Sequence, residues 1–124
     1  MKSIVLTILT IVAGAALVLA AERTITLEGT LVSSACYLGK FHQTGNDMGT
    51  HKNCGSECLK NGDPAGLLSK NNEFHVLVVS SHKLAPYVGQ PVRVTGTDHN
   101  GAIKVEKVEV AEDGKWKEVN LTSK

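Results

Sequence analysis

Apolar and polar residues alternate strictly over residues 24–31. Ile25, Leu27 and Leu31 lie on one side of this stretch, and threonine and glutamate side chains lie on the other. A period of two residues predicts a β-strand with one buried face. Gly29 inside the stretch predicts a bulge or a sharp bend, because a glycine in a strand interior has no side chain to pack.

Two shorter apolar stretches predict the next strands, over residues 66–69 and 73–80. A pair of asparagines at 71–72 separates them and is a turn signal. Residues 73–80 are apolar on both faces, which predicts a central strand. Residues 83–89 fit a helical turn that ends at a glycine.

The pattern alternates again in the last third of the chain. Residues 91–97 predict one strand, the Asn-Gly pair at 100–101 predicts a tight hairpin turn, and residues 102–110 predict the returning strand. The apolar face changes within the returning strand, so we expect a bulge near residues 106–107. An Asp-Gly pair before Trp116 offers one more turn.

These periodic segments amount to about five strands of similar length, with one cysteine-rich insertion after the first. The sequence therefore predicts a mainly β fold. The expected architecture is a small five-stranded antiparallel Greek-key barrel of the OB type, with a Cys/His-rich insertion that contains a short helix. A small β-sandwich is the alternative.

Residues 1–21 have the layout of a secretory signal peptide. A positive start precedes an apolar run over residues 4–19, which small alanines follow. This layout predicts cleavage after Ala20 or Ala21 and export to the periplasm or the extracellular space. The alternative is an uncleaved membrane anchor, although the apolar run is slightly short for a spanning helix. Residues 22–124 then form a single domain, with no stable membrane insertion after cleavage.

Charge and aromatic content argue against nucleic-acid binding, a common use of OB-type domains. The chain has 13 Lys plus Arg against 12 Asp plus Glu, which gives no basic footprint for nucleic acid. Single-stranded nucleic acid also requires aromatic side chains on which bases stack. The aromatic residues are too scattered for a stacking row: Tyr37, Phe41, Phe74, Tyr87 and Trp116. We expect no nucleic-acid partner.

The insertion, residues 36–62, has no strand periodicity and holds all three cysteines and two of the five histidines. A short helix is predicted over residues 54–60. Asn53 or Thr50 caps its start, and the Asn-Gly pair at 61–62 stops it.

Helix geometry brings part of this chemistry together. Positions three and four apart share a helix face, so Cys54 and Cys58 project together. His51 joins them if the helix begins at Thr50. If Asn53 is the cap, His51 lies one turn upstream in the loop and can still reach them. Cys36, at the end of the first strand, closes the set.

Three thiolates and one imidazole form a recognised Zn(II) coordination set. Cu(I) also prefers thiolates and can use two or three of them. The candidate metal ligands are Cys36, His51, Cys54 and Cys58. His42 and Met48 lie in the same loop as spare ligands. The sequence thus predicts a metal-binding module in a structural or metal-handling role, and no feature requires catalysis.

Two alternatives stay open for the cysteines. Exported proteins reside where thiols oxidise, so Cys36 can pair with Cys54 or Cys58 in a disulfide that staples the insertion. The odd cysteine count then leaves one thiol unexplained. A redox thiol is the second alternative, since Cys54 lies near a helix start with His51 close by.

Several stretches of the sequence resemble a group of small exported bacterial proteins of uncharacterised function. The stretches are Cys36-Tyr37-Leu38, His51-x2-Cys54-x3-Cys58, residues 62–68 and residues 84–96. The resemblance covers nearly all of the chain after the signal peptide, and the Cys/His stretch is its most specific part. It implies that the ordered Cys, His, Cys, Cys set is the site, and it adds no reaction.

Members of that group often carry an aspartate between the first strand and the first cysteine. This chain has Ser33 and Ser34 in that region. A role for such a carboxylate therefore does not carry over to this chain.

Overall fold

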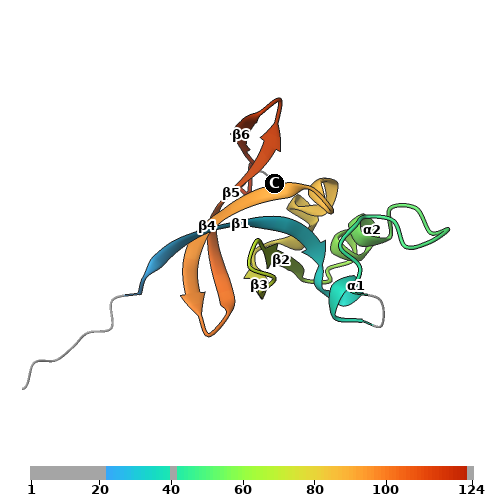
Figure 1. The fold of residues 1–124 in the computed structure, drawn as a ribbon, viewed down its shortest axis with the longest axis horizontal. Coiled ribbons are helices and arrows are strands. Elements are labelled where there is room, and N and C mark those ends of the chain that lie inside the picture. The colour runs from blue at the N-terminus through green and yellow to red at the C-terminus, as the bar shows by residue number, and fades with distance from the viewer. Residues whose placement is uncertain (1–21, 40–41, 123–124) are drawn as a thin grey trace, which may run out of the picture.

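The computed structural model describes residues 22–39 and 42–122. The expected signal peptide, residues 1–21, lies outside the described residues, as does Phe41. Within the described part, no helix has the length and apolar character needed to cross a membrane. The elements follow in the order β1 (Thr24–Ser33), α1 (Ser34–Leu38), α2 (Cys54–Lys60), β2 (Ala65–Ser69), β3 (Phe74–Val78), η1 (Ser81–Lys83), η2 (Ala85–Tyr87), β4 (Pro91–His99), β5 (Ala102–Glu112) and β6 (Lys115–Glu118) (Figure 1).

The six described strands form one sheet in the order β3-β2-β1-β4-β5-β6, and β3 also pairs with β5. This confirms the mainly β prediction and differs from a sandwich, which has two sheets. The β3–β5 pairing is parallel, so the expectation of antiparallel pairing throughout is wrong at this pair. The chain returns to β3 through η1, η2 and β4, which brings β5 alongside in the same direction as β3.

The sixth strand, β6, is absent from the predicted set. It has only four residues, Lys-Trp-Lys-Glu, and three of them are charged. Such a segment gives no hydrophobic alternation to detect. It is a strand because Asp113 (φ 52°) and Gly114 (φ 73°) form a tight turn that folds it back onto β5.

The strand β1 bends, as its Gly29 predicts, and pairs with two neighbouring strands. Residues 24–30 pair with β4, and residues 29–33 pair with β2. Gly29 pairs on both sides, and a Cβ atom there would collide with the backbone carbonyl of Leu68. Glycine is therefore required at the point where β1 passes from one partner to the other.

The predicted bulge in β5 is confirmed by the register of β4 and β5. Thr95 pairs with Lys107 and the next residue, Gly96, pairs with Val105, so Glu106 is the extra residue. The predicted hairpin turn has Asn100 at φ 55° and its following glycine at φ 92°, which fits a tight two-residue connection.

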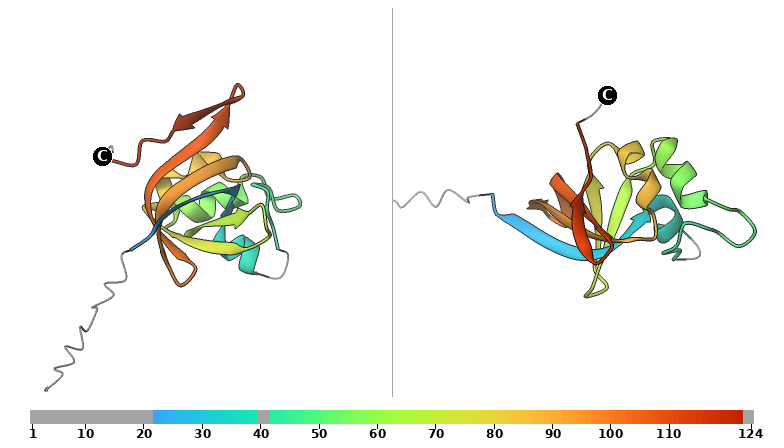
Figure 2. Two further views of the ribbon diagram at one scale, coloured as in Figure 1. Left: turned by 60° about the vertical axis from the view of Figure 1, so that its left-hand side comes forward. Right: turned by 90° about the horizontal axis from the view of Figure 1, so that it is seen from above.

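The apolar faces of the strands enclose one core, to which helix α2 also contributes. Buried members include Leu31 of β1, Leu67 of β2, Val94 of β4 and Ile103 of β5. Leu59 adds the apolar side of α2 and is fully buried. Helices α1 and α2 lie together at one end of the strands, and the β5–β6 hairpin projects elsewhere (Figures 1 and 2).

Candidate metal centre

Cys36 lies on α1, a single helical turn, and not at the end of the first strand as expected. Ser33, the last residue of β1, caps this turn, and its Oγ accepts a hydrogen bond of 3.4 Å from the Cys36 backbone N–H. The Ser34 N–H donates to the Pro64 carbonyl at 3.0 Å, which ties α1 to the segment that follows α2. Cys36 is thereby fixed next to the second helix.

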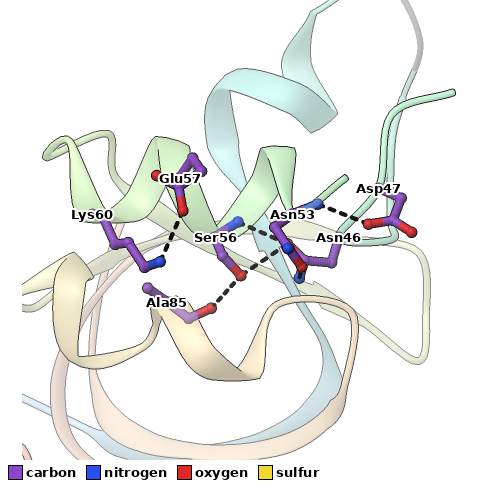
Figure 3. Close-up of polar contacts among 7 residues, drawn as sticks. All are labelled: Asn46, Asp47, Asn53, Ser56, Glu57, Lys60 and Ala85. Carbon is purple, nitrogen blue, oxygen red and sulfur yellow. Dashed lines mark hydrogen bonds and ion pairs between the residues drawn. The ribbon is translucent and has the colours of Figure 1, made fainter. Parts of the chain in front are cut away.

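Cys54 and Cys58 lie on α2, whose predicted bounds are confirmed. The N-cap position is Asn53, but its side chain makes no capping hydrogen bond, because the residue adopts a left-handed conformation (φ 57°). Asn46 provides the cap from seven residues upstream. Its Oδ1 accepts a hydrogen bond from the Ser56 N–H at 2.8 Å and lies 2.9 Å from the Ser56 hydroxyl oxygen (Figure 3).

The buried side of α2 is bound to the 3-10 turns η1 and η2. The Ser56 hydroxyl donates to the Ala85 carbonyl at 2.7 Å, and the Ser81 hydroxyl donates to the Leu59 carbonyl at 3.1 Å. Gly55 permits this close approach, because a Cβ atom there would lie 2.6 Å from a methyl group of Val88. These contacts fix the rotation of α2 about its axis and turn its two cysteines toward α1.

The result is a cluster of the thiols of Cys36, Cys54 and Cys58, whose sulfur atoms all lie within 4.8 Å of one another. The Cys36 and Cys58 sulfurs are 3.9 Å apart, and none of the three forms a disulfide. Ligands on tetrahedral Zn(II) with Zn–S bonds of about 2.3 Å stand about 3.8 Å apart. The thiol cluster can therefore close on a metal ion with small side-chain adjustments.

The electrostatics of the thiol cluster favour protonated sulfurs in the absence of a cation. Burial raises the pKa of Cys58 to about 12, the hydrogen bond and charge of Cys36 add to this increase, and the Ser33 hydroxyl opposes it. Burial, then the charge of Cys36, also raises the pKa of Cys54. A bound cation would reverse this balance, because it stabilises the thiolate form.

His51, the predicted fourth ligand, lies outside the thiol cluster. Its backbone exchanges two hydrogen bonds of 2.9 Å with Met48, and its side chain is exposed. Since α2 begins at Cys54, His51 is on the preceding turn and not on the helix face.

The aromatic residues near α1 make two ring contacts. Tyr37 stacks on Phe74 with ring centroids 5.1 Å apart, and the ring of His42 meets Tyr37 edge-on at 5.7 Å. This pair packs inside the fold, and the expectation of no stacking row for bases stays a prediction. The contact joins β3 to α1, so its evident role is to hold the helix that bears Cys36.

Comparison with known proteins gives no family. No family model matches the chain, and no curated protein and no solved structure matches it either. The function is therefore inferred from the geometry of the thiol cluster.

Proposed function

We propose that the protein is an exported module that binds one metal ion, Zn(II) or Cu(I), through Cys36, Cys54 and Cys58. The observation that carries this proposal is the approach of the three sulfurs to within 4.8 Å across two helices. Cys36 is 18 and 22 positions away from the other two cysteines in the chain, so their approach is a result of the fold and not of sequence proximity. His51 is retained as an auxiliary ligand to be tested.

The surroundings of the thiol cluster support a site for a cation. Each cysteine is only partly exposed, and burial raises the pKa of both Cys54 and Cys58. A metal ion that displaces the thiol protons supplies the positive charge needed to keep several thiolates together. Binding should accordingly release protons and strengthen as pH rises.

We further propose that the sheet is a closed barrel of the OB type. Each of β1 to β5 has two neighbours in the ring β1-β2-β3-β5-β4, which the β3–β5 pairing completes. Export to the periplasm or the extracellular space and membership of the resembling bacterial group are parts of the same proposal. We propose no nucleic-acid partner.

Elemental analysis combined with thiol titration tests the metal proposal on protein isolated from its natural compartment. We expect about one metal ion per chain, with three thiols reactive only after the metal is removed or the chain is unfolded. Cys54→Ser and Cys58→Ser should each lose Zn(II) and bind Cu(I) more weakly, because only two thiolates remain. A metal-free native protein with a disulfide at Cys36 would contradict the proposal and favour the stapled-domain interpretation.

A pair of histidine variants defines the contribution of His51. His51→Ala should lower metal affinity if the imidazole swings in to complete the site, while His82→Ala serves as the matched control. His82 lies on η1, apart from the cysteines in sequence, and is also exposed. Its Nδ1 forms a hydrogen bond of 3.0 Å with the Ser80 hydroxyl. Equal metal content in both variants would restrict the ligand set to sulfur.

A further inference from the structure

The thiol cluster contains three ligands, whereas structural zinc sites are almost always four-coordinate. Cu(I) is a soft ion that thiolates select, and it is satisfied by two or three of them. We infer that the thiol cluster holds Cu(I) on sulfur alone and passes it to a thiolate acceptor, which enters at an open coordination position. This inference rests on the proposed metal binding and adds the identity of the ion and its exchange partner.

The protein fixes the cysteines of α2 without help from their thiols. Leu59 is fully buried in the core, and hydrogen bonds join Ser56 to the Ala85 carbonyl and Ser81 to the Leu59 carbonyl. A structural zinc site contributes the folding free energy that its segment lacks. Here that segment already has a core anchor and buried hydrogen bonds, so the metal is free to arrive and leave.

Cys36 is fixed just as independently. The Ser33 cap and the bond from the Ser34 N–H to Pro64 hold its backbone, and the Tyr37–Phe74 stack holds the next residue. Ligands held in place before the metal arrives reduce the ordering cost of binding. The ion can therefore leave without unfolding α1 or α2. A site that is loaded repeatedly needs this property.

The cysteines are also accessible to an acceptor. All three are partly exposed, and helices α1 and α2 lie together at one end of the strands (Figure 1). An incoming thiolate can thus reach an ion on these sulfurs directly.

The exchange proceeds without oxidation or reduction. The acceptor thiol gives its proton to solvent, and its sulfur forms a bond to Cu(I). One Cu–S bond to the protein then breaks, and the released thiolate takes up a proton. Repetition with further acceptor sulfurs frees the remaining cysteines, and copper stays in the Cu(I) state throughout.

The test uses protein loaded anaerobically with Cu(I) and mixed with glutathione. Copper remaining on the chain is measured after rapid gel filtration, and X-ray absorption of the loaded protein gives the ligand types. We expect sulfur neighbours only, and a rate of copper loss that doubles when the glutathione concentration doubles, because the acceptor binds before copper leaves. His51→Ala should change neither result.

A peptide with two cysteines forms the second arm of the experiment. Faster loss to this peptide than to glutathione at equal thiol concentration would favour a dithiol acceptor, equal rates would favour a single-thiol acceptor, and either result would support exchange by attack of a thiolate.

The two proposals fail in different ways. A rate independent of acceptor concentration, or a nitrogen ligand that disappears in His51→Ala, would overturn the exchange inference alone. So would a protein that binds Zn(II) but forms no Cu(I) complex. A protein that binds neither ion would overturn the proposed function itself.

Discussion

The sheet and the cysteine segment, residues 34–62, are ordered by different kinds of interaction. Among the described residues, the main core draws its buried members from the strands, the η1–η2 region and Val119, and from the cysteine segment it takes only Leu59. That segment is held mostly by hydrogen bonds made by Ser33, Asn46 and Ser56. The order of the cysteine segment thus depends on Leu59 and a few polar groups, so the loss of either kind of contact should be felt at the site.

The largest expected effect is removal of Leu59, the core anchor of α2. Leu59→Ala should lower the free energy of unfolding by about 2–5 kcal/mol, because it leaves a cavity between α2 and the sheet. Leu38→Ala is the matched control, since Leu38 is 61% exposed on α1 and should change stability by about 0.5 kcal/mol or less. Urea denaturation measures both. Similar losses in the two variants would mean that α2 is not packed into the core.

The next effect concerns the cap supplied from a distance. Asn46→Ala removes the side-chain acceptor of the Ser56 N–H and should cost about 0.5–2 kcal/mol. It should also weaken metal binding, although no thiol is changed. The cap holds the start of α2, and Cys54 is the first residue of that helix. Calorimetric titration with metal, together with urea denaturation, tests this.

Asn71→Ala is the control for that cap, as an asparagine on the exposed turn between β2 and β3. Its stability and metal affinity should stay close to those of the parent. If Asn46→Ala behaved like Asn71→Ala, the Asn46 side chain would have no part in positioning the site.

The last of these predictions concerns the metal-free protein in alkali. Near neutral pH its effect is the smallest of those expected. The pKa of Cys58 rises from its ordinary value of 9.0 to about 12 on folding, so the folded chain keeps a proton that the unfolded chain loses. This stability contribution is complete below pH 9.0 and is lost as pH rises toward about 12.

Cys58→Ser isolates that contribution from other groups that titrate in alkali. The stability difference between the parent and this variant should be constant below pH 9 and should shift against the parent above it. Urea denaturation at a series of pH values provides the measurement. A difference that does not vary with pH would show that the Cys58 thiol is not buried beside the other two.

The contrast between the two regions also explains what the sequence could predict. Alternation predicts β1 and β4, the change of face predicts the extra residue Glu106, and the Asn-Gly pair predicts its hairpin. Period and turn chemistry are local, so they can be recognised without the fold. The β3–β5 pairing depends on the path of the whole chain, and no local pattern contains it.

The site was predictable in its thiols but not in its supports. The spacing of Cys54 and Cys58 on a helix is a local property, and it is observed. Ser33 precedes a one-turn helix, and a serine before Ser-Ala-Cys is the kind of capping signal that could have located α1. Asn46 acts across a loop on a helix that begins eight residues later, and nothing in its neighbours marks it.

The measurement that tests the metal proposal most directly is mapping of cysteine alkylation by mass spectrometry while metal is added to the reduced protein. We predict that Cys36, Cys54 and Cys58 lose reactivity together and that protection is complete at about one ion per chain. Cysteines that become protected at different metal ratios, or that stay reactive at saturation, would contradict a shared site on these three sulfurs.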